Sequence, residues 1–275
     1  MVHLPGCRNH VVEGAVCRNW QSSPLIVQPD GKVRAYGRAS SHGDALDDKG
    51  NLIAWSQANA IRGVLADRAL AAEFSKVDDD WVTIEAKKAT RAVIAAAAKA
   101  GGAEKKADLG TDLHSWTERL DLGLSLDGMP PEFELDLMAY EHATRDMTHL
   151  VIEEFCVLDS HRIAGTPDRI TEYEGENYVF DLKTGSVAFP NKMSVQLAVY
   201  SRSELYAQAE DGTAVRTPLP PVNQERAIIL HLPAGQGQAT PYWIDIAKGY
   251  RAIQEYVPIV KAWRADKTLL TPISA

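Results

Sequence analysis

The chain has 275 residues, 45% of them hydrophobic, and a formal net charge of −8 at pH 7. This length and hydrophobic content allow a substantial core, either as one large domain or as a core with an appendage. A long apolar run, a signal peptide and a lipidation motif are all absent, which argues against a membrane or secreted protein. Because three cysteines provide no disulfide framework, the sequence predicts a cytoplasmic protein.

Residues 1–50 are rich in turns, and we interpret them as an N-terminal arm before a domain over 51–275. Pro29-Asp-Gly31 predicts a hairpin turn within this arm. Four potential zinc ligands lie near its start: His3, Cys7, His10 and Cys17. They could close a tetrahedral structural zinc site. An ordered loop with free thiols explains the same residues.

Two helices are predicted between Asn51 and Gly101, the second over 84–100, where alanine is abundant. Basic residues gather in two groups: Lys87, Lys88, Arg91, Lys99, Lys105 and Lys106, and Lys32, Arg34 and Arg38. These groups could line a path for DNA phosphates or could form ordinary solvated surfaces. The stretch 120–144 has six acidic residues and no lysine or arginine. We predict a solvated acidic helix here, and the alternative is an acidic flank that would repel DNA and confine it to the basic side.

A β-hairpin is predicted further along the chain, with strands over 163–173 and 178–184 that are rich in β-branched and aromatic residues. Glu174-Gly175 provides a two-residue turn between these strands. This turn pairs Tyr173 with Glu176 and thereby fixes the register of the residues further out.

Counting outward along this hairpin places Asp168 directly opposite Asp181, so both carboxylates share one face. Lys183 is two residues beyond Asp181 and points to the same face. Two carboxylates this close repel each other unless they share a hard divalent cation such as Mg²⁺ or Mn²⁺. The three side chains therefore predict metal-dependent phosphodiester cleavage. The alternative is a solvated strand edge with an ordinary salt bridge.

Flanking elements could bring further side chains to this face. His114 lies in a predicted helix start at 110–118. A helix predicted over 192–208 places Gln196 and Tyr200 four residues apart on one face. Strands over 227–232 and 241–246 and a closing helix over 247–264 complete a predicted α/β fold with a mixed sheet.

The order of these motifs resembles the RecB-like branch of the PD-(D/E)XK nuclease superfamily, as found in CRISPR-associated and actinobacteriophage exonucleases. The resemblance covers roughly residues 110–203 and consists of His114, Gly165-x-x-Asp168, Asp181-x-Lys183 and Gln196-x-x-x-Tyr200. It implies a restriction-endonuclease-like core in which a mixed β-sheet is flanked by helices. For a phage protein, the compartment would be the host cytoplasm.

The resemblance also implies roles for individual residues. The metal ligands for Mg²⁺ or Mn²⁺ would be His114, Glu153, Asp168 and Asp181. The strand before the hairpin offers two glutamates for this role, Glu153 and Glu154, of which we favour Glu153. One or both could instead simply solvate the strand. Lys183 would be the catalytic lysine, and Gln196 and Tyr200 would orient this lysine, the water or the DNA phosphate. The CRISPR-associated members hold an iron–sulfur cluster with four cysteines, whereas this chain has three, so we expect no such cluster.

The function that we expect is a metal-dependent DNA exonuclease in recombination, replication or end processing, with DNA and a recombination or replication protein as partners. A structure-specific endonuclease is one alternative. A catalytically silent DNA-binding or assembly protein that keeps the nuclease fold is another. A zinc-ribbon regulatory protein would depend on the first seventeen residues alone. The choice of exonuclease over endonuclease comes from the resemblance.

Overall fold

The computed structural model describes residues 4–7, 16–48, 50–77, 83–209, 211–266 and 268, with the side chains of 104–107 excepted. It divides into two compact units, a larger one of residues 1–47 and 116–275 and a smaller one of residues 48–115. Helix α5 (Ala103–Asp121) runs unbroken through this division. In the described part of the chain, every helix is too short or too polar to span a bilayer.

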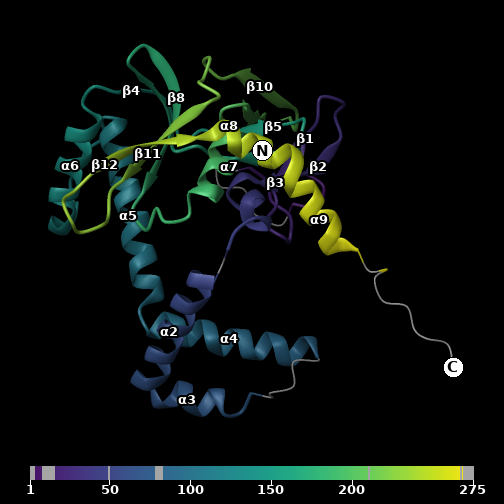
Figure 1. Ribbon diagram of the computed structural model, residues 1–275, viewed down its shortest axis with the longest axis vertical. Coiled ribbons are helices and arrows are strands. Elements are labelled where there is room, and N and C mark those ends of the chain that lie inside the picture. The colour runs from purple at the N-terminus through teal and green to yellow at the C-terminus, as the bar shows by residue number, and fades with distance from the viewer. Residues whose placement is uncertain are drawn as a thin grey trace. The chain divides into compact units, whose positions relative to one another are not determined.

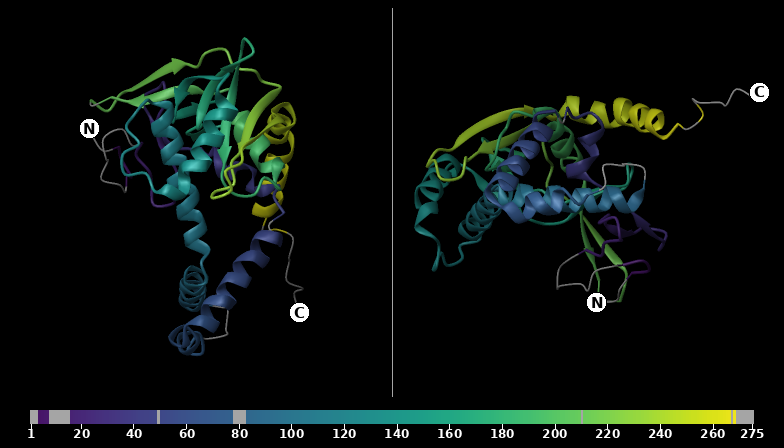
Figure 2. Two further views of the ribbon diagram at one scale, coloured as in Figure 1. Left: turned by 90° about the vertical axis from the view of Figure 1, so that its left-hand side faces the viewer. Right: turned by 90° about the horizontal axis from the view of Figure 1, so that it is seen from below.

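The smaller unit is helical and contains three helices before α5: α2 (Gly50–Ala66), α3 (Arg68–Phe74) and α4 (Ile84–Ala100). The predicted helix over 84–100 is confirmed. A separate α3 was not predicted, and it begins where the Asp67 carboxylate accepts a hydrogen bond from the N–H of Ala69. Helices α2 and α4 lie side by side (Figures 1 and 2). A Cβ on Gly63 would lie 1.9 Å from the Ala97 carbonyl oxygen, so this crossing requires glycine.

The larger unit contains two five-stranded sheets within the described residues. The first has the order β12-β11-β8-β7-β4, and only β8 and β11 are parallel neighbours, so the sheet is mixed. Its strands are β4 (Thr148–Ile152), β7 (Arg169–Tyr173), β8 (Glu176–Lys183), β11 (Arg226–His231) and β12 (Thr240–Asp245). The predicted strands at 227–232 and 241–246 are confirmed to within one residue.

The second sheet has the order β10-β9-β5-β6-β3. Its strands are β3 (Gly37–Arg38), β5 (Cys156–Leu158), β6 (Ile163–Gly165), β9 (Glu204–Gln208) and β10 (Ala214–Pro218). Strand β3 belongs to residues 1–50 and pairs with β6. The predicted hairpin around Pro29-Asp-Gly31 is present as the pair β1 (Leu25–Val27) and β2 (Val33–Ala35).

Helices cover both faces of the first sheet, which confirms the α/β class with a mixed sheet flanked by helices (Figure 1). The remaining helical segments of the larger unit are α1 (Ala39–His42), η1 (Gly43–Ala45), η2 (Pro131–Phe133), α6 (Glu134–Thr144), α7 (Pro190–Tyr200), α8 (Ile246–Arg251), the π-helical η3 (Ala252–Tyr256) and α9 (Val257–Ala265). Helix α7 contacts strands of both five-stranded sheets, including β6 and β8. Consistent with this position, six of its eleven residues are buried.

Two predicted elements are wrong in their extent. The predicted strand over 163–173 is two strands in different sheets, because the chain crosses from β6 to β7 through Thr166-Pro-Asp168. The predicted helix over 192–208 ends at Tyr200, and β9 begins at Glu204. The hydroxyl of Ser203 donates to the Val199 carbonyl oxygen, which satisfies an acceptor at the end of α7.

The sequence predicts a solvated acidic helix over 120–144, but two of its carboxylates have partners inside the protein. Asp136 is fully buried on α6, and its carboxylate accepts hydrogen bonds from the N–H groups of Gly235 and Gly237 at 2.6 and 2.7 Å. Only 6% of the Asp121 side chain is exposed, and Arg169 and Tyr140 are its partners. These two carboxylates therefore have internal partners, whereas Glu134 and Glu141 are exposed.

Candidate metal centre

Asp168, Asp181 and Lys183 lie together at the end of the β7–β8 hairpin. The predicted register is confirmed, since Tyr173 pairs with Glu176 across the turn. The Asp168 carboxylate accepts a hydrogen bond from the N–H of Leu182 at 2.7 Å, which holds it beside the partner strand. Lys183 Nζ forms an ion pair with the Asp181 carboxylate. The structure therefore places all three groups at the same edge.

Three side chains offer donor atoms that lie within 4.8 Å of one another: His114, Glu153 and Asp168. Glu153 follows β4, and its N–H donates to the Asp168 carbonyl oxygen at 3.0 Å. His114 lies on α5, one turn before Thr117, and α5 continues unbroken to Asp121. This group could hold a metal ion. Asp181 lies outside the group and is paired with Lys183.

Burial perturbs the charges at this edge. Burial and the neighbouring Asp168 raise the pKa of Glu153 to about 7, although 33% of its side chain stays accessible to solvent. Burial also raises the pKa of Asp168, against the opposing effect of Lys183. For Lys183, burial favours the neutral form, but the carboxylates of Asp181 and Asp168 outweigh it and raise the pKa. A cation between the carboxylates would favour their charged forms.

Gln196 and Tyr200 lie on α7, as predicted, and their side chains meet. Gln196 Nε2 donates to the Tyr200 hydroxyl at 3.3 Å. Tyr200 is 3% exposed, and burial raises its pKa far above the usual value, so the hydroxyl keeps its proton. The charges of Cys156, Asp181 and Asp168 raise this pKa further.

Gly165 makes room for the Tyr200 ring. A Cβ at this position would lie 2.9 Å from the Tyr200 hydroxyl oxygen and 3.2 Å from Ala39 Cβ. We expect Gly165→Ala to displace the ring from Gln196 and to lower the free energy of unfolding by about 1–3 kcal/mol, the usual cost of overpacking a core. Urea unfolding measures the change.

Gly185→Ala is the matched control for this prediction. A Cβ on Gly185 meets no atom within 4 Å, and its φ is not positive, so its stability should change by less than about 0.5 kcal/mol. Equal unfolding midpoints for Gly165→Ala and Gly185→Ala would show that Tyr200 moves aside at no cost.

Sequence reasoning missed Arg169, which is completely buried next to Asp168. Its Nε donates to Asp121 Oδ2 at 2.8 Å, and its Nη2 donates to the Thr117 hydroxyl at 3.2 Å. Its Nη1 lies 3.6 Å from a Glu153 carboxylate oxygen. One guanidinium therefore links the end of α5 to the candidate metal ligands. The sequence signal that could have revealed Arg169 is a charged residue at an inward-facing position of a strand, opposite Phe180.

The hydrogen-bond network of Arg169 and Asp121 continues over one face of the first sheet. The Tyr140 hydroxyl donates to Asp121 Oδ2 at 2.8 Å and lies 3.3 Å from His149 Nε2. His149 Nδ1 lies 2.8 Å from the Thr171 hydroxyl oxygen. Tyr140, His149 and Thr171 therefore have polar partners inside the protein, as burial requires.

The N-terminal zinc candidates are only partly described, because His3 and His10 lie outside the described residues. Cys17 is buried, and a hydrogen bond links it to Cys7. Burial and this contact raise the pKa of the Cys17 thiol. Both side chains pack with Leu4, Leu25 and Val27. Two of the four predicted ligands are thus neighbours.

The two predicted basic groups lie on different elements. Lys88, Arg91 and Lys99 are exposed on α4, spaced so that they follow one side of the helix. Arg34 and Arg38 are exposed near β2 and β3, and Lys32 pairs with Asp30 at 3.4 Å. The side chains of Lys105 and Lys106 are outside the described part.

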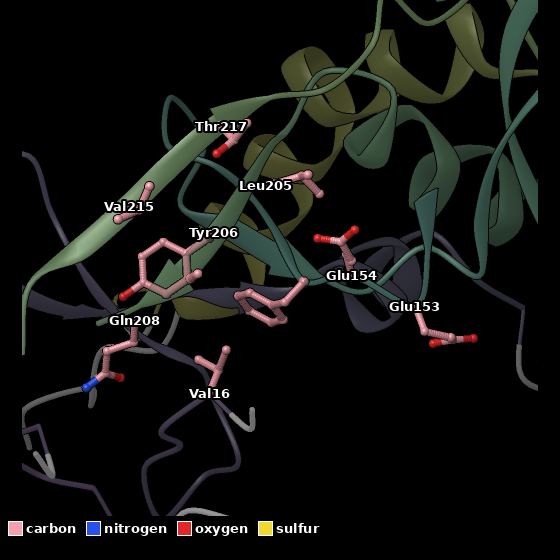
Figure 3. Close-up of a pocket in the computed structure, with 10 residues that line it drawn as sticks. Val16, Glu153, Glu154, Leu205, Tyr206, Gln208, Val215 and Thr217 are labelled. Atoms are coloured by element: carbon pink, nitrogen blue, oxygen red, sulfur yellow. The ribbon is translucent and has the colours of Figure 1, made fainter. Parts of the chain in front are cut away.

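A pocket of about 320 Å³ opens beside the candidate metal centre (Figure 3). It lies over the second sheet, between the β4–β5 connection and the β9–β10 hairpin. Its lining comprises Val16, Glu153, Glu154, Phe155, Leu205, Tyr206, Ala207, Gln208, Val215 and Thr217. Glu153 is thus shared between the pocket and the donor group.

Comparisons with models of protein families and with curated proteins found no match to this chain.

Proposed function

We propose that this protein is a metal-dependent nuclease that hydrolyses phosphodiester bonds in DNA. The observation that carries the proposal is the gathering of Asp168, Asp181 and Lys183 at one sheet edge, with Glu153 and His114 as further donors. The motif order of RecB-like nucleases supports the same reaction. Exonucleolytic action and a role in recombination, replication or end processing follow from that resemblance.

The donor chemistry fits a divalent cation. Glu153 and Asp168 provide hard carboxylate oxygens, which suit Mg²⁺ and Mn²⁺, and His114 provides an imidazole nitrogen. Burial raises the pKa of both carboxyl groups, so their charged forms need a nearby positive charge. A bound cation would polarise a phosphoryl oxygen and offset negative charge in the transition state.

The remaining side chains have separate tasks in this proposal. Asp181 holds the Lys183 ammonium in place through their ion pair. The raised pKa keeps Lys183 charged at neutral pH, so it can stabilise the charge that develops on the phosphate. The Tyr200 hydroxyl stays protonated and can donate a hydrogen bond toward the same edge.

DNA as the substrate is supported by the exposed basic side chains of α4. Lys88, Arg91 and Lys99 can neutralise phosphates, whereas the chain as a whole carries a charge of −8. Binding through such residues weakens as salt rises, since each phosphate contact releases counterions.

The test is degradation of end-labelled linear DNA and of closed-circular DNA, with Mg²⁺, Mn²⁺ or EDTA. We expect wild-type protein to degrade linear DNA only when metal is present. Asp168→Asn should lower the rate by at least a hundredfold, because the amide is a poor ligand for a hard cation. Its side-chain oxygen can still accept from the Leu182 N–H, so the fold should persist.

Asp211→Asn serves as the control for removal of one carboxylate. Asp211 is exposed and bonds only locally, to Thr213, among its described hydrogen bonds. Its rate should equal that of the wild type. Nicking of circles would assign an endonuclease instead. DNA binding without cleavage under every condition would contradict the proposal and favour the silent DNA-binding protein.

A further inference from the structure

The β4–β5 connection directs two adjacent glutamates in opposite directions. Glu153 has φ +50°, a left-handed conformation that is strained for a residue with a side chain. Figure 3 shows the Glu154 carboxylate directed toward Leu205 and the Glu153 carboxylate directed away from it. The backbone on both sides is fixed, since the Glu153 N–H donates to Asp168 and the Phe155 carbonyl oxygen accepts from the Tyr206 N–H.

This strained turn therefore connects the metal centre to the neighbouring pocket. Glu153 is a member of the donor group, and Glu154 lines the pocket one residue later. One end of a ligand in the pocket would therefore lie next to Glu153, a member of the donor group. Strained backbone that persists beside such a group is commonly part of a functional site.

Apolar and polar groups contribute about equally to the lining of the pocket. Leu205 and Ala207 on β9 are directly opposite Thr217 and Val215 on β10, so these four side chains share one face. Phe155 and Tyr206 lie on the opposite face of these strands, where their rings pack edge-to-face at 6.0 Å between centroids. The Tyr206 hydroxyl accepts from the Val27 N–H, which ties β9 to β1 behind Leu205 and Ala207.

We propose that this pocket binds the nucleobase at the end of the DNA strand whose phosphate lies at the metal centre. The inference rests on the proposed function and specifies the part of the substrate that the site recognises. About 320 Å³ is at the small end of ligand pockets, which span about 300–1,000 Å³. This volume suits one base with its sugar. The aliphatic side chains of Leu205, Ala207 and Val215 offer an apolar surface to the face of a base.

Glu154 gives the pocket a preference among bases. An ionised carboxylate only accepts hydrogen bonds, so it favours a base with an exocyclic amino group. Cytosine, adenine and guanine carry such a group, and thymine does not. The pocket should therefore bind deoxycytidine more tightly than thymidine.

The test measures binding of deoxycytidine and thymidine by ligand-observed NMR, in EDTA, so that cleavage plays no part. Wild-type protein should bind deoxycytidine at least tenfold more tightly than thymidine. Ala207→Trp, which fills the pocket, should weaken deoxycytidine binding at least tenfold. Glu154→Gln should reduce the difference between the two nucleosides to less than threefold.

Glu204→Trp is the matched control for Ala207→Trp, since Glu204 is exposed on the same strand and points to the other face. It should bind deoxycytidine like the wild type. Thermal unfolding shows whether either variant is misfolded, and Glu154→Gln provides a test that needs no large side chain.

The outcomes separate this inference from the proposed function. Equal affinities for the two nucleosides, or deoxycytidine binding that survives Ala207→Trp, would overturn the pocket assignment even if DNA is cleaved. Deoxycytidine binding that Ala207→Trp removes would support the pocket even if no DNA is cleaved, and the nuclease proposal alone would then fail.

Discussion

Arg169→Met is expected to lower the free energy of unfolding by about 3–5 kcal/mol, the usual cost of removing one partner of a buried ion pair. The substitution leaves the Asp121 carboxylate without its guanidinium partner, and only 6% of the Asp121 side chain reaches solvent. It also removes a donor from the Thr117 hydroxyl. Unfolding by guanidinium chloride, followed by tryptophan fluorescence, measures the loss.

The double variant Arg169→Met/Asp121→Asn tests the reason for this loss. Removal of both charges should recover part of the stability, since no unpaired charge then stays buried. A double variant that is less stable than Arg169→Met alone would refute the electrostatic explanation and would indicate lost packing instead.

The loss should also depend on pH. Burial lowers the pKa of His149, Asp121 opposes this effect, and Arg169 adds to it. Without Arg169, folded protein takes up a proton on His149 more readily than the wild type does. The difference in stability between wild type and Arg169→Met should therefore shrink as pH falls below about 6.5, the ordinary pKa of histidine.

Lys183→Met is expected to lower the rate of DNA cleavage by about 10²–10³, the usual effect of removing one group that stabilises transition-state charge. Affinity for Mn²⁺ should stay the same or increase, because Lys183 no longer competes for the carboxylates of Asp181 and Asp168. Single-turnover cleavage and Mn²⁺ titration by electron paramagnetic resonance measure the two effects.

Lys192→Met is the control for this result. Lys192 also pairs with an aspartate, Asp44, at 2.7 Å, and its exposure of 34% is close to the 25% of Lys183. Its cleavage rate should match that of the wild type. Similar losses in both variants would mean that general destabilisation, and not the position of Lys183, explains the reduced rate.

The sequence predicted local features well where the chain itself decides them. Glu174 and Gly175 both have positive φ, as a tight two-residue turn requires, and this turn set the register that brings Asp168 to Asp181. The alanine-rich helix over 84–100 is likewise determined by local propensity.

Tertiary pairing decided the features that the sequence did not predict. Residues 163–165 and 169–173 have equal strand character, and their separation into two sheets depends on β5, β3 and β4 as partners. Residues 204–208 were wrongly included in a predicted helix, because their own sequence does not reveal that they pair with β10 and β5. Partners far apart in sequence override local preference in such cases.

The candidate site, like the fold, was predicted only in part from the sequence. The hairpin carboxylates and Lys183 followed from alternation along a strand, and the resemblance contributed His114 and Glu153. Arg169 and Asp121 were missed, since a buried pair of charges 48 residues apart leaves no periodic pattern in the sequence. The pocket was missed for the same reason, because its walls come from separate strands and from Val16.

The position of helix α7 determines how the larger unit, residues 1–47 and 116–275, should unfold. It packs against β5 and β6 of one sheet and against β8 and β12 of the other, and the two sheets share no strand. Loss of α7 would expose the apolar faces of both sheets to water at once. The two sheets therefore form a single cooperative folding unit, and the amides of α7 should be among the slowest in the protein to exchange with solvent.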